Sequence, residues 1–308
     1  MMTTWFDVPE AAGRFHIIEL PFAATSSFRR VAHHGPAAMR EASAQIDLQL
    51  IDGRCPADAG LSAERLSVSA MHDRAATAMD ALRAGHGDAA AVIQPCNHVD
   101  ALLEAAVSAA VGRHQRPMVI GGDHGSVFGA FAAASAAYDE LGLLQIDAHA
   151  DLRKAYEGLP HSHASIMQRA LDNTPLAGLV QVGVRDLCAE ELQRIRSDDR
   201  ITCFFDETLA FERLDGDLWS HQVARIVEAL PEKVWISFDI DGLDPSLCPG
   251  TGTPVPGGLS WTMACALIDA VGRSGRQLVG ADLCEVAGTP TDAIIGSRLA
   301  YRLLAAML

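Results

Sequence analysis

Hydrophobic residues in this chain form short uninterrupted runs that alternate with longer amphipathic stretches, most regularly after residue 116. Such runs are typical of strands buried on both faces, and the longer stretches have the spacing of helices. The runs predict strands at 117–123, 143–151, 179–186, 201–207, 234–241 and 277–286. The stretches between them predict helices at 125–138, 163–171, 189–197, 218–230, 260–272 and 293–308. This alternation predicts an α/β fold with a mostly parallel sheet covered by helices on both faces.

The first third of the chain is less regular. Segments 15–22 and 45–50 favour strands, and segments 62–84 and 98–114 favour helices. No linker or internal repeat separates this third from the rest, so we expect a single domain over residues 1–308. We recognise neither a signal peptide nor a run of about 18 apolar residues, which predicts a cytoplasmic protein that does not bind membranes.

The formal net charge of −15 bears on the choice of partners. No cluster of Lys or Arg stands out, so we expect no binding of nucleic acid, which depends on clustered cations. The seven cysteines are scattered without CxxC spacing, as in proteins with reduced thiols. A chain of 308 residues needs no metal merely to fold, so any metal site is expected to serve chemistry.

Side chains that can bind metals follow three of the predicted strands. The segments are GGDHG at 121–125, DAHAD at 147–151 and DID at 239–241. Alternate residues of an extended chain point to the same side, and ligands bind at the carboxyl ends of parallel strands. We therefore expect one site built from six side chains: His124, Asp147, His149, Asp151, Asp239 and Asp241.

Four aspartates around one point are costly to bury unless cations or protons neutralise them. Imidazole and carboxylate ligands without thiolate favour manganese, iron, nickel or zinc. Each segment alone has an ordinary explanation as a turn, a helix cap or a polar loop. Three such segments at strand ends of one sheet favour a site for two divalent cations instead.

GGDHG, DAHAD and SFDIDGLDP, in this order, resemble the motifs of the ureohydrolases, the family of arginases, agmatinases and related guanidino hydrolases. Three further segments, 33–43, 249–260 and 281–286, resemble other parts of that family, so the similarity runs from about residue 20 to the end of the chain. The resemblance implies a three-layer α/β/α fold and two Mn²⁺ ions per subunit, with Ni²⁺ as an alternative. It also implies a homo-oligomer, a trimer or a hexamer.

The resemblance assigns a role to each of the six side chains. Asp147 and Asp239 would bridge the two ions. The remaining ligands would be His124 and Asp151 for one ion, and His149 and Asp241 for the other. The two ions would together lower the pKa of a shared water and so supply hydroxide to attack the guanidinium carbon.

The same resemblance implies three catalytic residues. Asp151 would orient the nucleophile and relay its proton, and Glu285 would accept hydrogen bonds from the guanidinium group. His163 would supply a proton to the leaving amine, with His161 as the alternative. We expect Asp123 to support the site or its turn without binding metal.

The residues after DAHAD bear on the substrate. Arginases usually carry Asn at the position of Arg153, so the resemblance favours agmatine, cleaved to putrescine and urea. If Arg153 or Arg185 pairs with a substrate carboxylate, 4-guanidinobutyrate or 3-guanidinopropionate fits better, and arginine or a formimino compound stays open. An alternative of another class is a non-catalytic metal-binding subunit of a hetero-oligomer. Val31 stands where many relatives have Gly, which leaves the local loop conformation open.

Overall fold

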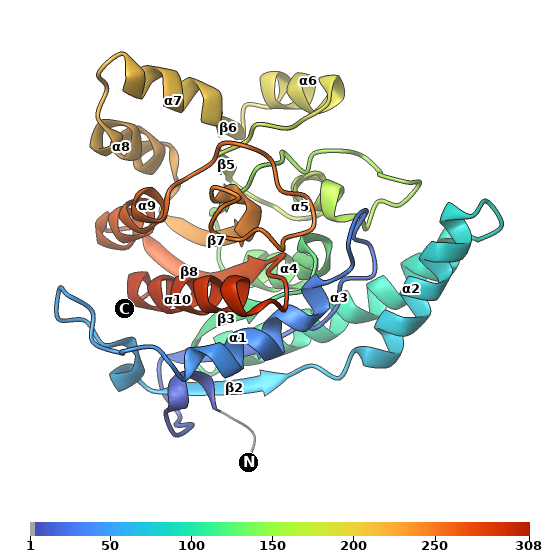
Figure 1. The fold of residues 1–308 in the computed structure, drawn as a ribbon, viewed down its shortest axis with the longest axis horizontal. Helices are drawn as coiled ribbons and strands as arrows, with labels where there is room; N and C mark the ends of the chain where they lie inside the picture. The colour runs from blue at the N-terminus through green and yellow to red at the C-terminus, as the bar shows by residue number, and fades with distance from the viewer. Residues whose placement is uncertain (1–3) are drawn as a thin grey trace.

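A single eight-stranded sheet runs through the computed structural model, which describes residues 4–308 (Figure 1). The strand order is β2-β1-β3-β8-β7-β4-β5-β6, and every neighbouring pair is parallel. The strands are β1 (Phe15–Glu19), β2 (Leu61–Arg65), β3 (Arg116–Ile120), β4 (Leu141–Ile146), β5 (Gly178–Val182), β6 (Ile201–Phe204), β7 (Lys233–Asp239) and β8 (Gln277–Cys284). The prediction of an α/β fold with a mostly parallel sheet is confirmed.

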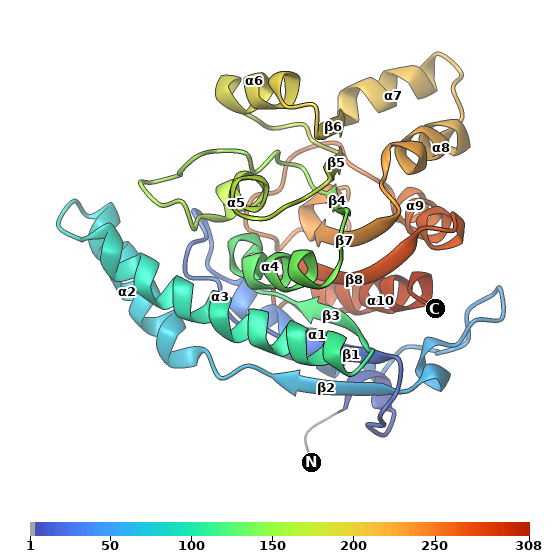
Figure 2. The same cartoon turned by 180° about the vertical axis from the view of Figure 1, so that it is seen from behind.

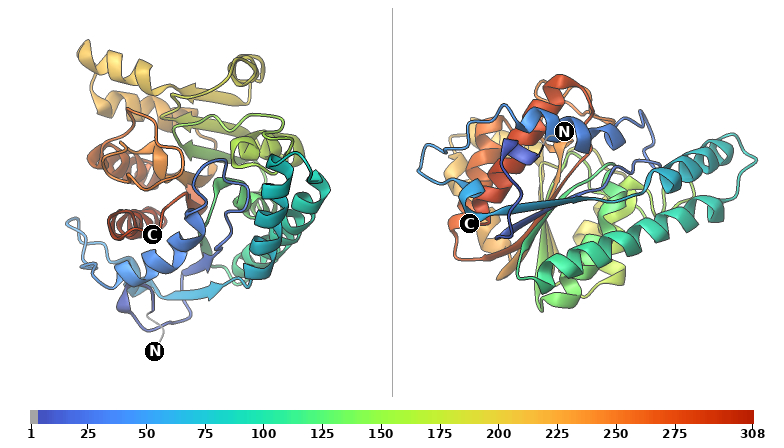
Figure 3. Two further views of the ribbon diagram at one scale, coloured as in Figure 1. Left: turned by 45° about the vertical axis from the view of Figure 1, so that its right-hand side comes forward. Right: turned by 90° about the horizontal axis from the view of Figure 1, so that it is seen from below.

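Helices cover both faces of this sheet and make three layers (Figures 2 and 3). The helices are α1 (Gly35–Ser43), α2 (Ser69–Arg83), α3 (Ala89–Gly112), α4 (Phe128–Ala137), α5 (Ile166–Asn173), α6 (Ala189–Ser197), α7 (Asp206–Leu214), α8 (Trp219–Ala229), α9 (Trp261–Arg273) and α10 (Pro290–Ala306). On one face α1, α10, α9 and α8 pack side by side, and on the other α2, α3, α4 and α5 do so. None of the helices within residues 4–308 has an apolar stretch long enough to cross a lipid bilayer.

The core lies in two hydrophobic layers, one on each face of the sheet. Along β1, Ile17 belongs to the layer under α10, and its neighbour Ile18 belongs to the layer under α3. Along β3, Ile120 belongs to the layer under α10 and Val119 to the layer under α3. Because successive strand residues point to opposite faces, a strand with both faces buried needs an uninterrupted apolar run.

In the first third of the chain, one prediction was wrong and two predicted helices begin at other residues. Residues 45–50 form no strand, and the edge strand β2 lies at the start of the predicted helix 62–84, so α2 begins only at Ser69. As an edge strand β2 pairs with one neighbour and carries exposed polar side chains, so it lacks an apolar run. Helix α3 begins nine residues before the predicted 98 and continues through Pro95, which is buried among apolar neighbours. Tertiary packing there outweighs the hydrogen bond that proline cannot donate.

Candidate active site

Four adjacent strands bring the predicted site residues together. The four strands are neighbours in the order β3-β8-β7-β4. Asp239 is the last residue of β7, and the other three residues come shortly after their strands: His124 after β3, Glu285 after β8 and Asp147 after β4. Because all four strands are parallel, these ends meet at one edge of the sheet. The sequence prediction that the polar segments share one edge is confirmed.

Tight turns, and not an extended chain, orient the aspartates of segments 147–151 and 239–241. Strand β4 ends at Ile146, and Asp147 Oδ1 accepts a hydrogen bond from the backbone N–H of His149 at 2.7 Å. In the same way, Asp239 Oδ1 accepts from the N–H of Asp241 at 2.9 Å. The expected alternation along an extended strand was therefore wrong, although the side chains do converge. Short carboxylate-to-backbone bonds of this kind are typical of Asp in turns.

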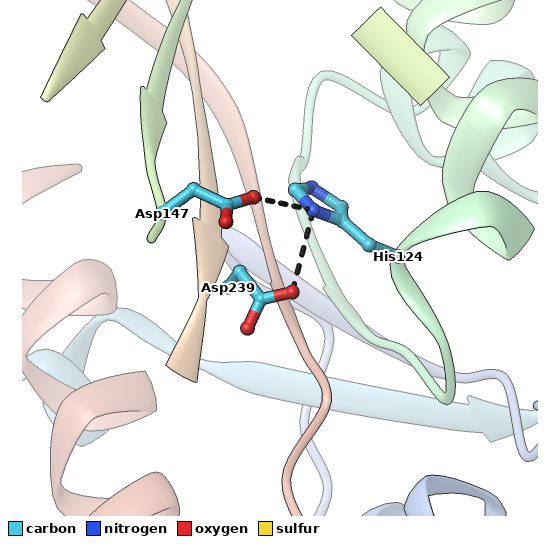
Figure 4. A group of neighbouring side chains, drawn as sticks. All are labelled: His124, Asp147 and Asp239. Carbon is cyan, nitrogen blue, oxygen red and sulfur yellow. Dashed lines mark hydrogen bonds and ion pairs between the residues drawn. The ribbon is translucent and has the colours of Figure 1, made fainter. Parts of the chain in front are cut away.

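The first group of side chains lies around the Nδ1 atom of His124. Its nearest carboxylate oxygens belong to Asp147 at 3.0 Å, Asp151 at 3.2 Å and Asp239 at 3.5 Å. Figure 4 shows that Asp147 and Asp239 point at His124 from two neighbouring strand ends. All four side chains are almost entirely buried. His124, Asp147 and Asp239 offer ligand atoms within 4.8 Å of one another, a spacing that suits a metal ion.

The second group lies beside the first and shares Asp147 with it. His149 Nδ1 lies 3.1 Å from Asp241 Oδ2 and 3.5 Å from Asp147 Oδ1. These three residues also offer ligand atoms within 4.8 Å of one another. His149 is the more exposed of the two histidines, so this group lies nearer the opening of the site.

Electrostatics in the site favour added positive charge. Burial, with the charge of Asp147 second, raises the pKa of Asp151 to about 7, and burial also raises the pKa of Asp239 well above its usual range. Burial would raise the pKa of Asp147 too, but hydrogen bonds with the two histidines outweigh it and lower that pKa. For His149, burial lowers the pKa, but the carboxylates of Asp241 and Asp147 outweigh burial and raise it to about 12. So many carboxylates in a buried site require bound cations or extra protons.

Glu285 enters the site from the end of β8 in an unusual backbone conformation. Its φ is +60°, and that of Asp151 is +53°, values that side chains other than Gly seldom adopt. Glu285 N–H donates to the carbonyl of Gly122 at 2.8 Å, while its Oε1 accepts from the N–H of His124 at 3.0 Å. Gly122 is required here, because a Cβ would lie 2.0 Å from the carbonyl oxygen of Phe22. Backbone strain of this kind concentrates at functional sites.

The two candidate histidines for proton transfer point to different places. His163 is nearly buried, and its Nδ1 lies 3.6 Å from Glu285 Oε1. Burial, with His149 second, lowers the pKa of His163 to about 3. His161 Nε2 instead lies 2.7 Å from Asn97 Oδ1 on α3. Only His163 therefore faces the group that includes Glu285.

A cavity of about 140 Å³ leads from this site toward solvent. Its lining residues are Ser27, His149, Asp151, Arg153, Tyr156, His163, Ala164, Asp186 and Thr253. The Arg153 guanidinium lies 5.1 Å from the centre of the Tyr156 ring, and its Nε lies 3.6 Å from Glu191 Oε2. Asp186 is largely exposed, and its carboxylate lies 3.9 Å from His149 Nε2.

Arg185, in contrast, is occupied with the backbone. It donates to the carbonyl oxygens of Gly183, Asp241, Leu243 and Val255 at 2.7–3.2 Å. These bonds tie the glycine-rich loop to the end of β7. Arg185 thus has a structural function that competes with any pairing to a substrate carboxylate.

Other predicted residues take supporting positions. Asp123 is buried and accepts from the N–H and hydroxyl of Thr25, both at 2.9 Å, as expected for a residue that supports the site. Asp244 Oδ1 accepts from the N–H of Ser246 at 2.9 Å and shapes the turn after β7. Val31 has a φ of −104°, so this position needs no glycine.

Sequence reasoning missed the residues that support His124 and His163. Ser237 Oγ lies 2.7 Å from His124 Nε2, and Ser237 donates to buried Asp282 at 3.0 Å. Ser237 and Asp239 lie two residues apart on β7, so the period of a strand gave a signal for the first of these contacts. Ser27 lies far from His163 in sequence, and nothing in its local pattern marks it.

The chain is similar to one known protein family and to individual proteins that are about 30% identical to it. The model of the family described as "Arginase family" matches residues 14–308. The N(1)-aminopropylagmatine ureohydrolase of Synechocystis sp. is 31% identical over 298 residues, which cover 94% of this chain and 87% of that protein. The agmatinase of Halalkalibacterium halodurans is 30% identical over 190 residues, 60% of this chain and 61% of that protein.

The solved structures also include similar folds. Proclavaminate amidino hydrolase from Streptomyces clavuligerus has a TM-score of 0.80 and 23% identity, and the match covers all of this chain and 97% of that one. At this identity the similarity concerns the fold, and it agrees with three layers around a parallel sheet.

Proposed function

We propose that this chain, which belongs to the arginase family, hydrolyses a guanidine that carries a cationic amine tail, with agmatine as the first candidate. The protein is a ureohydrolase, a hydrolase that cleaves a C–N bond of guanidino compounds. The products from agmatine would be urea and putrescine. One observation carries the choice of tail: Asp186, an exposed carboxylate, lies at the cavity beside His149.

The donor set supports two divalent cations, Mn²⁺ first and Ni²⁺ as an alternative. His124, Asp147, Asp151 and Asp239 would hold one ion, and Asp147, His149, Asp239 and Asp241 would hold the other. When bound, the pair supplies Lewis acidity that lowers the pKa of a shared water. A protein with a buried core of this size folds without metal, so the cost of assembling four aspartates is best explained by this chemistry.

Three side chains act directly on the substrate in this proposal. Glu285 accepts hydrogen bonds from the guanidinium N–H groups and orients its planar carbon. Asp151, whose carboxylate lies 3.2 Å from His124 Nδ1, orients the attacking water and relays its proton. His163 gives its Nδ1 proton, on the side that faces Glu285, to the leaving amine while its Nε2 takes up a proton from solvent, so the ring is neutral again after the step.

The environment of Arg153 favours a cationic tail over an acidic one. Its guanidinium stacks on Tyr156 and lies near Glu191, so its charge is partly compensated already. Among residues 4–308, the one ion pair of the Asp186 side chain is with His149 Nε2, at 3.9 Å. A tail ammonium can therefore pair with Asp186 at small desolvation cost, whereas a tail carboxylate has to displace contacts of Arg153.

A longer tail is the second candidate. The Synechocystis relative, named N(1)-aminopropylagmatine ureohydrolase, matches nearly the whole chain. N(1)-aminopropylagmatine extends agmatine by one aminopropyl unit and so brings a second cationic centre toward the mouth of the cavity. The negative charge of the protein is compatible with either substrate.

The test is urea release by Mn²⁺-loaded protein from agmatine, N(1)-aminopropylagmatine, 4-guanidinobutyrate, 3-guanidinopropionate and arginine. We expect the two cationic substrates to have the highest kcat/KM, and an Asp147→Ala variant to have none. Preference for a guanidino acid would overturn the choice of tail. If no compound releases urea although two metal ions per chain are present, a formimino substrate or a non-catalytic subunit is favoured.

By analogy with the family, we also propose one ureohydrolase domain that assembles into a cytoplasmic homo-oligomer, a trimer or a hexamer. Light scattering of the purified protein measures the number of subunits.

A further inference from the structure

The loop between β1 and α1 contacts His163 through one residue, Ser27. The hydroxyl oxygen of Ser27 lies 3.0 Å from His163 Nε2, and the backbone N–H of Ser27 donates to the same nitrogen at 3.3 Å. Ser27 is partly exposed and lines the cavity, while the His163 side chain is nearly buried. Ser27 is therefore the neighbour of His163 on the solvent side.

The backbone bond specifies which ring nitrogen of His163 carries the proton. A backbone N–H can only donate, so Nε2 must be the acceptor. The neutral ring then carries its proton on Nδ1, which faces Glu285 Oε1 at 3.6 Å. The opposite tautomer would set the Nε2–H of His163 against the N–H of Ser27 and leave no proton on the nitrogen that faces Glu285.

Two anchors hold the loop in the position that this contact requires. Two residues before Ser27, the N–H and hydroxyl of Thr25 bind buried Asp123 at 2.9 Å. One residue before Ser27, the carbonyl of Ser26 accepts a hydrogen bond from Arg83, at the end of α2, at 2.8 Å. Arg83 also binds Glu157 at 2.7 Å and so joins this loop to the one that carries Tyr156. The loop is thus held just before Ser27 by two separate segments.

We propose that Ser27 is a positioning residue that holds His163 in the Nδ1–H tautomer and directs its proton toward the reacting guanidine. The inference rests on the proposed function only for the role of His163, because the tautomer itself follows from the contacts. The charged and titratable groups around His163 are Glu285, His149, Asp147, His124 and Arg83. None of them donates to Nε2 within the described residues, so this function falls to Ser27.

The kinetic test compares three variants of the Mn²⁺-loaded, full-length protein. Ser27→Ala removes the hydroxyl and keeps the backbone donor, Ser27→Thr keeps both, and Ser26→Ala is the matched control. The Ser26 hydroxyl is buried and has no hydrogen-bond partner among residues 4–308. We expect Ser27→Ala to lower kcat about tenfold with little change in KM, while Ser27→Thr and Ser26→Ala stay near the wild type.

The pH profile separates positioning from general damage. Because both bonds from Ser27 favour the unprotonated Nε2, loss of the hydroxyl should raise the pKa of His163. The limb of the kcat/KM profile that titrates His163 should then move to higher pH in Ser27→Ala only. Metal content and the thermal midpoint should equal those of Ser26→Ala. If kcat and the pH profile of Ser27→Ala match those of the control, the proposal is wrong.

A direct measurement does not depend on any substrate. Solid-state ¹⁵N spectra of histidine-labelled protein loaded with diamagnetic Zn²⁺ distinguish the two tautomers, and a His163→Asn variant assigns the signal. We expect a single Nδ1–H form in the wild type and also in Ser27→Ala, where the backbone donor remains, with the Nε2 signal of the variant shifted because this nitrogen has lost one of its two contacts. A wild-type His163 with its proton on Nε2 would overturn the inference even if urea is released. The expected tautomer in a protein that releases no urea would instead count against the proposed function alone.

Discussion

The indole N–H of Trp235 donates to Asp282 Oδ2 at 2.6 Å, on two adjacent strands beneath the site. Asp282 is fully buried and also accepts from Ser237, whose hydroxyl oxygen lies 2.7 Å from His124 Nε2. Gly280 makes room for the indole, since a Cβ there would lie 2.2 Å from the Trp235 ring. The chain of contacts places the Nε2 proton of His124 toward Ser237 and leaves Nδ1 free for a metal ion.

Replacement of Trp235 by Phe tests this chain of contacts. The variant keeps an aromatic ring in the core and removes one donor to a buried carboxylate, which should cost about 1–3 kcal/mol of unfolding free energy. We also expect Mn²⁺ affinity to fall about tenfold, because outer partners of metal-binding histidines have effects of that size. Urea denaturation and metal titration measure the two effects. Unchanged affinity would show that Asp282 and Ser237 orient His124 without the bond from Trp235.

Asp147 is the carboxylate that both His/Asp groups share, so its loss should affect both ions. Asp147→Asn keeps the size of the side chain and removes its charge. We expect Mn²⁺ affinity to fall at least about a hundredfold and urea release to fall to background. Elemental analysis after dialysis checks the metal content. Retention of two ions per chain by this variant would contradict the proposed bridging position.

Much of the site was predictable because it depends on strand ends. His124, Asp147 and Asp239 each follow or close an apolar strand, and the parallel sheet must bring such ends to one edge. The resemblance to the ureohydrolases, carried by the same segments, is confirmed by the match to the arginase family. Glu285 and His163 also lie at the site, as the resemblance implied.

What the sequence left open depends on contacts between distant segments. The 20–31 loop places Ser27 against His163, 136 residues away, and no local pattern encodes that contact. Strand β2 was missed because an edge strand needs no apolar run, and Pro95 hid the start of α3. In each case tertiary packing decided between local alternatives of similar energy.

Asp186 gives a test of substrate choice that leaves the metal site intact. In Asp186→Asn the tail ammonium loses its partner, and we expect KM for agmatine to rise about tenfold, equivalent to about 1.4 kcal/mol. KM for 4-guanidinobutyrate should fall or stay the same. Asp139→Asn makes the same charge change at an exposed residue just before the start of β4, away from the site, and is the control. Equal KM for agmatine in both variants would exclude Asp186 as the tail partner.

Three histidines next to the same loop predict how stability depends on pH. The ring of His33 lies 3.8 Å from that of His34 and 4.4 Å from that of His72, measured between centroids. Burial, followed by the charges of His72 and His34, lowers the pKa of His33 to about 4. Burial also lowers the pKa of His72, although Asp73 opposes this effect. The folded protein therefore resists protonation of this cluster.

A lowered histidine pKa destabilises the folded state in acid. Between pH 6.5 and about 4 the unfolded chain binds a proton at His33 and the folded chain does not, so stability falls as the pH falls through this range. His33→Gln should make the loss of thermal midpoint between pH 7 and pH 4.5 smaller by about 2–4 °C, a modest change because solvent screens a partly buried ring. His86→Gln, at an exposed histidine, should leave the loss unchanged. Thermal melts of the metal-loaded proteins across this range check the prediction, and parallel curves for His33→Gln and the wild type would contradict it.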